Sequence, residues 1–496
     1  MNLNSKIINA AKWSSITEIV AKIVSPVTNM ILARLLAPEA FGVVATITMI
    51  ISFADMFTDA GFQKYLVQHE FKDEVEKSKA ANVAFWTNLF ISILIWIIII
   101  IFSNKIAIMV GNPGLGIVII IACIQLPLTS FSSIQMAIYK REFDFKTLFS
   151  IRIVAICIPF FVTIPLALCG LSFWALIIGN IAGVLFNAVL LTIKSKWKPK
   201  LYYSFDVLKK ILSFSIWSLI EGISIWFTTW IDTFIIGSVL SSYYLGIYKN
   251  SLVTVNGIFA IVTASTTPIL FSALSRVQND NIQFKNVFFK MQRFISYLVF
   301  PMAIGIFIYS DLVVDILLGE KWGEANNVIA IWGLISGIVI ILGHYSSEVY
   351  RSKGMPKLSF FAQLLHLIVL IPTCIIASKY EFNTLVNVRA LIRLQFILVH
   401  IILMQFIIGI SIRDMFKNVS ISAIASILMG VISLLLKHIY GGIGWQIISI
   451  LFSTILYLVI LICFPTTRKD IFKIIKHFKM DDKFFRITKL LSSNKV

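Results

Sequence analysis

The stretch NVAFWTNLFIS at residues 82–92 returns as NVFFKMQRFIS at residues 286–296, an offset of 204 residues. At the same offset, WSSI at 13–16 corresponds to WSLI at 217–220, Leu36 to Leu240, and Gly42 to Gly246. Several separated matches at one offset indicate an internal duplication. Many transporters are built from two related membrane halves whose interface holds the substrate site, so the repeat favours a transporter.

The composition around the repeat is that of a membrane protein. The 496 residues are 58% hydrophobic and only 14% charged, against about 25% charged in soluble domains, and the mean hydropathy is +0.90. A spanning helix needs about 20 mostly apolar residues. Fourteen such segments start near residues 12, 40, 83, 117, 147, 171, 211, 244, 288, 327, 358, 385, 417 and 445. The predicted fold class is therefore an all-α integral membrane protein with about fourteen transmembrane helices.

The repeat divides these helices into two six-helix bundles followed by two helices without a partner. Six is an even number, so both copies have the same orientation, as in repeats related by an axis along the membrane normal. The expected units are an N-terminal lobe at 1–193, a basic cytoplasmic linker at 194–210, a C-terminal lobe at 211–414, two extra helices at 415–465, and a cytoplasmic tail at 466–496. The tail is read as a basic amphipathic helix on the membrane surface, or else as an irregular basic segment.

The net charge of +19 is explained by topology rather than by nucleic-acid binding. With both termini in the cytoplasm, most of the 43 Lys and Arg fall on the cytoplasmic side. The outer side receives only Arg34, Lys105, Lys321, Lys379 and Lys437, and the spans hold Lys22, Arg152, Lys249, Arg389 and Arg393. This asymmetry follows the positive-inside rule and predicts a multi-pass protein of the cytoplasmic membrane. No cleavable signal peptide is recognised, and the five cysteines have neither disulfide nor zinc spacing.

Four of the predicted spans carry polar stripes at helical spacing, which places each stripe on one face of its helix. The stripes are Glu18, Lys22, Ser25 and Asn29 in the first span; Thr48, Ser52, Asp55, Asp59 and Gln63 in the second; Ser218, Glu221, Thr228 and Asp232 in the seventh; and Lys249, Asn256, Thr263 and Thr267 in the eighth. An ionised side chain at the bilayer centre costs at least about 2.5–3.5 kcal/mol. Polar faces that surround water avoid this cost.

We therefore expect a hydrated central cavity between the two lobes. The candidate substrate-binding residues are Glu18, Lys22, Asn29, Asp55, Asp59, Glu221, Asp232, Lys249, Asn256, Arg389 and Arg393. Helix direction suggests the pairs Lys22 with Asp55 and Asp232 with Lys249. The alternative is that the stripes pack as buried helix contacts.

Other intramembrane residues admit two readings each. Arg389 and Arg393 either face the cavity or bond to the carbonyls of neighbouring helices. Trp226 and Trp230 either stack on sugars or pack, and His366 and His400 read as hydrogen-bonded interior residues rather than proton relays.

The chain lacks the motifs of nucleotide and metal chemistry. It has no Walker-type phosphate loop, no His-Glu-x-x-His cluster and no glycine fingerprint of a nucleotide fold. The longest predicted external segment, Asp311–Asn327, is too short to form a catalytic domain. We expect no catalytic residue, metal or cofactor, and a protein that is not an enzyme.

The segment 31–42, ILARLLAPEAFG, followed by DAGF at 59–62 and LVQ at 66–68, resembles the opening of Wzx-type polysaccharide flippases of the MOP superfamily, in particular the WzxC and TuaB group of the polysaccharide transporter family. The second copy keeps the glycine as Gly246 but has Ser242 in place of the proline.

The resemblance implies a V-shaped pair of bundles that flips undecaprenyl-diphosphate-linked oligosaccharide repeat units, of O-antigen, capsule or exopolysaccharide, from the cytoplasmic to the outer leaflet of the inner membrane by alternating access. It implies partner polymerases and glycosyltransferases of the same pathway and the lipid bilayer itself. Lys22 and Lys249 lie on spans comparable to those that carry important cations in lipid II flippases, although the second span here carries Asp55 and Asp59 instead of a base. Segments 415–437 and 445–464 correspond to helices that form a lipid-tail groove in that branch.

Two rival functions remain from the sequence. A cation-coupled drug antiporter of the related MATE branch would need cavity acids without compensating bases. A membrane polymerase or ligase would generally need a large external loop. A scaffold role would leave the polar stripes unexplained.

Overall fold

The computed structural model describes residues 13, 17, 20, 21, 24–59, 61–355 and 357–477, with the side chains of 59, 213–218, 220, 221, 471 and 473–477 excepted. Over this part of the chain the regular structure is helical and no strand is present. Thirteen of the helical segments are long and apolar enough to cross a membrane. They coincide with the second to fourteenth predicted spans, and the first predicted span is described only in part, at residues 13, 17, 20, 21 and from 24 onward. The predicted all-α membrane fold is confirmed.

The N-terminal half contains a helical segment at 24–35 followed by α2 (Pro38–Asp59), α3 (Phe62–Gln68), α4 (Glu74–Met109), α5 (Gly116–Ala122), α6 (Gln125–Arg141), α7 (Phe145–Leu168) and α8 (Phe173–Lys194). The second half contains α9 (Phe205–Val239), α10 (Ser242–Arg276), α11 (Asn281–Ile308), α12 (Ser310–Leu317), α13 (Ala325–Val339), α14 (Ser346–Ser352), α15 (Lys357–Ala377), α16 (Phe382–Leu391) and α17 (Arg393–Leu403), with π-helical turns at Ile340–His344 and Met404–Ile408. Then follow α18 (Ile412–Ile439), α19 (Ile443–Cys463) and α20 (Pro465–His477).

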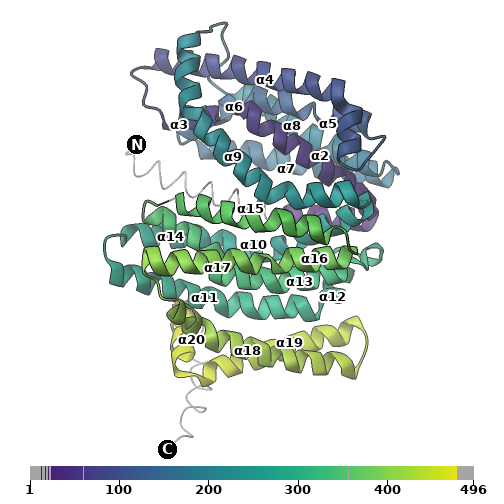
Figure 1. The fold of residues 1–496 in the computed structure, drawn as a ribbon, viewed down its shortest axis with the longest axis vertical. Helices are drawn as coiled ribbons and strands as arrows, with labels where there is room; N and C mark the ends of the chain where they lie inside the picture. The colour runs from purple at the N-terminus through teal and green to yellow at the C-terminus, as the bar shows by residue number, and fades with distance from the viewer. Residues whose placement is uncertain are drawn as a thin grey trace, which may run out of the picture.

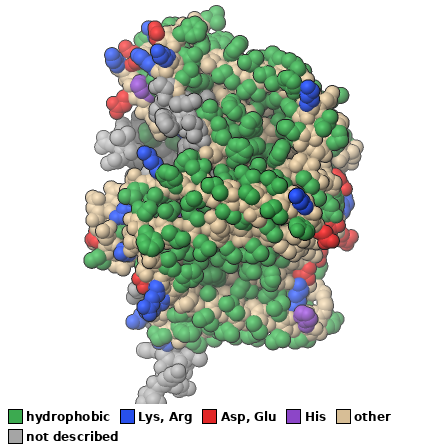
Figure 2. All heavy atoms as spheres, in the orientation of Figure 1, with side chains coloured by type: hydrophobic (Ala, Val, Ile, Leu, Met, Phe, Trp, Pro, Cys, Tyr) green, Lys and Arg blue, Asp and Glu red, His purple; other side chains and the backbone are tan. Residues whose placement is uncertain are grey.

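The long helices lie side by side in two stacked groups, with α18 and α19 at one edge (Figure 1). We call the segment 24–35 with α2–α8 the N-lobe and α9–α17 the C-lobe. The helix end that carries the loops at 142–144 and 195–204 is called the basic end, and the end that carries the loops at 110–115 and 240–241 the opposite end. Hydrophobic side chains cover most of the face shown in Figure 2, while charged side chains gather toward the two helix ends. This distribution matches a protein that crosses a membrane.

Acidic and hydroxyl side chains start several helices at the basic end. Asp73 Oδ1 accepts a hydrogen bond from the Glu76 N–H at 2.6 Å, and Asp144 Oδ1 accepts one from the Thr147 N–H at 3.1 Å. Asp280 caps α11 in the same way. These bonds satisfy N–H groups that have no partner within the first helical turn.

The two lobes cross closely near the opposite end, where α2 meets α10. A Cβ atom built on Gly42 would collide with the carbonyl oxygen of Ser242, and one built on Gly246 would collide with the carbonyl oxygen of Pro38. Gly42 and Gly246, like Pro38 and Ser242, are separated by the repeat offset of 204 residues. The crossing is therefore symmetric between the copies, and only glycine allows the backbones to approach so closely.

Two further contacts flank this crossing. They too are related by the repeat, because an offset of 204 residues takes Gly111 to Asp315 and Ala33 to Gly237. On one side Gly111, at φ +73°, packs on Gly237 of the C-lobe. On the other side Arg34 Nη2 donates to the backbone oxygens of Asp315 and Ile316 at 3.1 and 2.7 Å, and Trp322 Nε1 donates to the Ala33 oxygen at 2.8 Å. The lobes are thus joined at the opposite end.

The last two long helices pack on the C-lobe through α11. Ser296 Oγ lies 2.7 Å from Ser422 Oγ, and Tyr457 OH donates to the Tyr297 oxygen at 2.9 Å. Lys437 Nζ pairs with Asp311 Oδ1 at 2.8 Å. Helix α20 turns back at the basic end, where Asp470 pairs with Arg293 at 2.8 Å.

Candidate functional site

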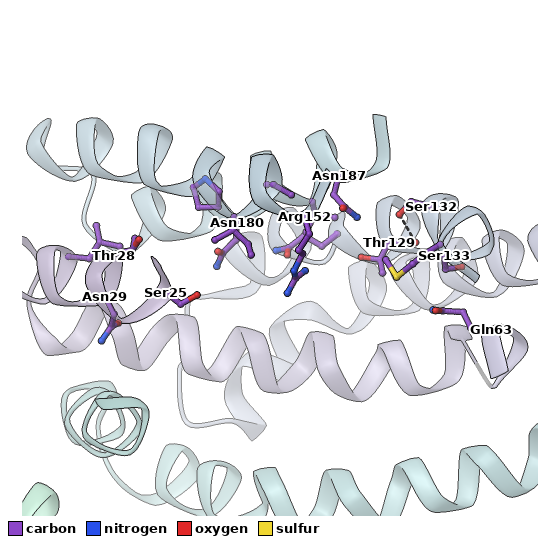
Figure 3. Close-up of a pocket in the computed structure, with 18 residues that line it drawn as sticks. Ser25, Thr28, Asn29, Gln63, Thr129, Ser132, Ser133, Arg152, Asn180 and Asn187 are labelled. Carbon is purple, nitrogen blue, oxygen red and sulfur yellow. Dashed lines mark hydrogen bonds between the residues drawn. The ribbon is translucent and has the colours of Figure 1, made fainter. Parts of the chain in front are cut away.

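A polar pocket of about 520 Å³ lies inside the N-lobe, between the segment 24–35, the start of α3, and helices α6, α7 and α8. Ten of its side chains carry a hydroxyl or an amide, and Figure 3 shows most of them arranged along the cavity. These ten residues are Ser25, Thr28, Asn29, Gln63, Gln125, Thr129, Ser132, Ser133, Asn180 and Asn187. The pocket has the size of an ordinary small-ligand site, about 300–1,000 Å³, but is unusually polar.

The pocket extends far along the helices. Gln63 marks the basic end, whereas Asn29, Gln125 and Asn180 lie in the half nearer the opposite end, to judge by their places in their helices. Polar side chains at such depth in a membrane are costly unless they meet water, one another or a ligand. The lining therefore fits a hydrated cavity that can receive hydroxyl-rich groups.

Arg152 is the one charged residue among the described residues that line this pocket. It lies seven residues into α7, which is about 10 Å from the start of that helix. Its side chain is exposed and points from α7 into the pocket, between Asn180 and Asn187 of α8 (Figure 3). Among the described residues its guanidinium has no hydrogen-bond or ion-pair partner, and no acid lines the pocket.

Close packing of α7 on α8 shapes the wall that carries these residues. A Cβ on Gly179 would collide with Thr163 Oγ1, and one on Gly183 would lie 2.9 Å from Pro159 Cγ. Small residues let the two helices approach, and this fixes Asn180 and Asn187 next to Arg152.

A second pocket of about 440 Å³ adjoins the first and shares Gln63, Thr129 and Ser133 with it. It is bounded by α2, α3, α4, α6 and α9, and it contains Asp55. Asn88 on its wall is held by Ser133 Oγ at 2.7 Å and Ser130 Oγ at 3.0 Å.

The interior of the C-lobe holds a buried charge cluster instead of a polar pocket of this kind. Asp232 Oδ2 pairs with Arg389 Nε at 3.0 Å, and both side chains are less than a tenth exposed. Tyr248 OH donates to the same oxygen at 2.8 Å, and the Thr233 N–H donates to Asp232 Oδ1 at 2.6 Å.

Trp332 completes the cluster from α13. The Arg389 and Arg393 guanidinium carbons lie 5.5 and 4.3 Å from its ring centroid, and Arg393 Nη1 also donates to Ser336 Oγ at 2.8 Å. Cation–π contacts of this type stabilise arginines away from water. The described partners of the two arginines are thus side chains of neighbouring helices rather than the helix carbonyls that one reading expected.

The predicted ion pair between Asp232 and Lys249 is replaced by the pair with Arg389. Tyr248 precedes Lys249, and neighbouring residues on a helix point about 100° apart. Tyr248 faces Asp232, while the Nζ of Lys249 lies 4.4 Å from the ring centroid of Trp230, still close enough to Asp232 for the two charges to interact.

The remaining candidate residues are dispersed. Asn29 lines the pocket and also donates to Asn250 Oδ1 of the C-lobe at 2.7 Å. Asn256 is exposed on α10 and lines neither polar pocket. Asp59 ends α2 and Glu221 lies within α9, but their side chains are outside the described part of the chain, as are Glu18 and Lys22 entirely. The pair of Lys22 with Asp55 thus stays a prediction.

The tryptophans and histidines have structural partners. Trp226 Nε1 donates to Ser52 Oγ of the N-lobe at 3.0 Å, and Trp230 receives Lys249 as described above. His366 Nδ1 lies 3.0 Å from Gln395 Oε1, and His400 Nδ1 lies 3.1 Å from Tyr350 OH. Packing and hydrogen bonding therefore account for these four residues.

The pocket in the N-lobe differs from the predicted cavity between the lobes. Its lining residues on α6 and α8 were not predicted, although the same helical spacing marks them: Asn180 and Asn187 are seven residues apart, and Gln125, Thr129, Ser132, Ser133 and Met136 follow one face of α6. Applying the stripe criterion to the fourth and sixth spans would have found them.

A family model described as polysaccharide biosynthesis protein matches residues 31–327. The chain belongs to this family. Curated proteins that are similar to this chain confirm its resemblance to Wzx-type polysaccharide flippases of the MOP superfamily. The lipopolysaccharide biosynthesis protein WzxC of Escherichia coli K12 is 23% identical over 76% of this chain and 76% of its own length. The teichuronic acid biosynthesis protein TuaB of Bacillus subtilis 168 is 22% identical over 73% of this chain and 74% of its own length.

Solved structures of other proteins share the fold of this chain. The lipid II flippase MurJ in an inward closed conformation superposes with a TM-score of 0.73 at 15% identity, covering 90% of this chain and 98% of its own. An inward-facing MATE multidrug transporter of the MOP superfamily gives 0.61 at 11% identity, covering 80% of this chain and 98% of its own. These likenesses establish the MOP architecture. Within the described residues no group of three or more His, Cys, Asp or Glu forms a potential metal site.

Proposed function

We propose that this protein moves undecaprenyl-diphosphate-linked oligosaccharide repeat units from the cytoplasmic to the outer leaflet of the bacterial inner membrane by alternating access. The observation that carries the proposal is the N-lobe pocket, which places ten hydroxyl and amide side chains within a membrane-embedded lobe. A sugar head group is covered with hydroxyls, and burying one unpaired hydroxyl costs about 1–3 kcal/mol. A pocket that replaces water at each of them lowers the barrier to crossing.

The names of the relatives support the same substrate class. They include biosynthesis proteins for lipopolysaccharide and teichuronic acid and a succinoglycan biosynthesis transport protein of Rhizobium meliloti. Glycosyltransferases that build the unit on the cytoplasmic side, and a polymerase that consumes it outside, would be its partners.

Orientation and shape agree with this direction. The basic end faces the cytoplasm by the positive-inside rule, and the lobes are joined at the opposite end through Gly42 and Gly246. With this orientation, the crossing at the opposite end would close the protein toward the outer side. An anionic substrate would gain about 2.3 kcal/mol per charge per 100 mV on moving outward.

The pocket disfavours the antiporter alternative. A carrier of cationic drugs needs unpaired carboxylates, whereas the described lining of the N-lobe pocket contains Arg152 and no acid, and Asp55 lines only the adjoining pocket. Asp232, the intramembrane acid of the C-lobe cluster, is bound by Arg389.

The test is depletion of the protein in its native host. We expect lipid-linked oligosaccharide facing the cytoplasm to accumulate, measured by protection from an external glycosidase in intact cells and its loss on permeabilisation. A depleted strain with the unchanged amount and sidedness of lipid-linked sugar would refute the proposed function. A strain that instead becomes sensitive to cationic dyes would support the antiporter.

A further inference from the structure

We propose that Arg152 binds the diphosphate that joins the sugar to its lipid. This inference rests on the proposed function and names the contact that function needs. It gives Arg152 the role that the sequence suggested for Lys249, while Lys22 lies outside the described residues.

An unpaired arginine within a membrane span requires a reason. Holding an ionised side chain in the membrane costs several kcal/mol unless it meets water or a counter-charge. Arg389 and Arg393 meet this requirement with Asp232, Ser336 and Trp332. Arg152 has no such partner among the described residues, and its position inside a pocket leaves the counter-charge to a ligand.

The chemistry of the lining selects an anion. Arg152 supplies a positive potential that no carboxylate of the described lining cancels. Its planar guanidinium can donate two parallel hydrogen bonds to phosphate oxygens. Lys249 is less suitable, because its ammonium faces the ring of Trp230 and lies near the Asp232–Arg389 pair.

The position of Arg152 suits a diphosphate with a sugar attached. Asn180 and Asn187 lie on either side of it in the view of Figure 3, and seven residues of helix separate them by about 10 Å. Amides flanking the guanidinium can bond to sugar hydroxyls or to further phosphate oxygens. The 520 Å³ pocket and the adjoining 440 Å³ pocket offer room for several sugars.

The experiment measures binding to the full-length protein in lipid nanodiscs. The probes are undecaprenyl diphosphate, its uncharged parent undecaprenol, and inorganic pyrophosphate, each read by the change in tryptophan fluorescence. We expect undecaprenyl diphosphate to bind well above undecaprenol, and Arg152→Gln to weaken it about 10-fold or more, since a charged hydrogen bond is lost. Arg152→Lys keeps the charge but not the fork and should lie between the two.

Arg413→Gln is the matched control, because Arg413 is an exposed arginine at the start of α18, distant from the pocket lining. It removes the same charge and should leave binding unchanged. Asn187→Asp retains Arg152 and the side-chain size but places a carboxylate in the pocket, and it should weaken undecaprenyl diphosphate while leaving undecaprenol unaffected. This second variant decides the matter if Arg152→Gln fails to fold.

Unchanged affinity in both Arg152→Gln and Asn187→Asp would overturn the inference. Binding of pyrophosphate without binding of the lipid diphosphate would overturn the lipid-linked source and assign the site to a soluble anion. These outcomes are separate from the depletion test: failed accumulation of lipid-linked sugar refutes the function, whereas normal accumulation together with full rescue by Arg152→Gln refutes only the role of Arg152.

Discussion

Adding one methyl group at the crossing of α2 and α10 should open the opposite end of the protein, where the two lobes meet. A Cβ at Gly42 would lie 1.8 Å from the Ser242 oxygen, so the helices must separate by about 1.6 Å to reach the 3.4 Å of ordinary contact. The Gly246→Ala change meets the Pro38 oxygen at the same 1.8 Å. Overpacking of this kind costs about 1–3 kcal/mol, which shifts the ratio of closed to open molecules about 5- to 150-fold.

The assay is the labelling of Thr46→Cys, a fully buried position of α2 beside the crossing, by a membrane-impermeant maleimide in a background with the five native cysteines replaced. Gly42→Ala and Gly246→Ala should both raise the labelling rate, and by similar factors, because the two collisions are equivalent. Gly305→Ala in α11 is the control, since a Cβ there meets no atom within 4 Å. A rate that rises in only one of the two variants, or in neither, would refute the symmetric closure.

Two further predictions concern the interiors of the lobes. Asp232→Asn or Arg389→Gln alone should lower the free energy of unfolding by about 3–5 kcal/mol, because each leaves a buried partner unpaired. The double variant should lose less than the sum of the two. Thermal unfolding in detergent measures these losses, and additive losses would show that the pair is not coupled. Asn180→Leu keeps the side-chain size but removes a pocket amide, so the transport rate should fall several-fold at normal expression. The rate is measured with the external glycosidase. An unchanged transport rate would exclude Asn180 from sugar binding.

The duplication and the spans were readable from the sequence because both depend on long patterns. Apolar runs of about 20 residues survive any local exception, and an offset of 204 residues recurs even where most positions have diverged. The sequence also marked Gly42 and Gly246 as equivalent, but not that they touch. That contact depends on the way in which the lobes meet, which no local pattern encodes.

The site was only partly predictable. The prediction selected Asp232, Arg389 and Lys249 because they are charged. A charged side chain in a membrane, however, is stabilised as easily by a side chain of a neighbouring helix as by water. A difference of one position along a helix, about 100° around its axis, decides between the two. Thus Tyr248, and not the predicted Lys249, contacts Asp232. Neutral amides such as Asn180 gave a weaker signal, although they define the pocket.

The walls of the pocket with Arg152 belong to a single lobe, and this has a thermodynamic consequence for a carrier that works by pivoting its halves. Cargo seated there keeps the same contacts before and after the pivot, and its affinity is then nearly equal on both faces of the bilayer. Equal affinity makes release as easy on one face as on the other, and like any passive carrier the protein gives no net flow without a driving force. On the proposed function, net export would be driven by voltage acting on the anion, or by enzymes that remove the cargo once it has arrived.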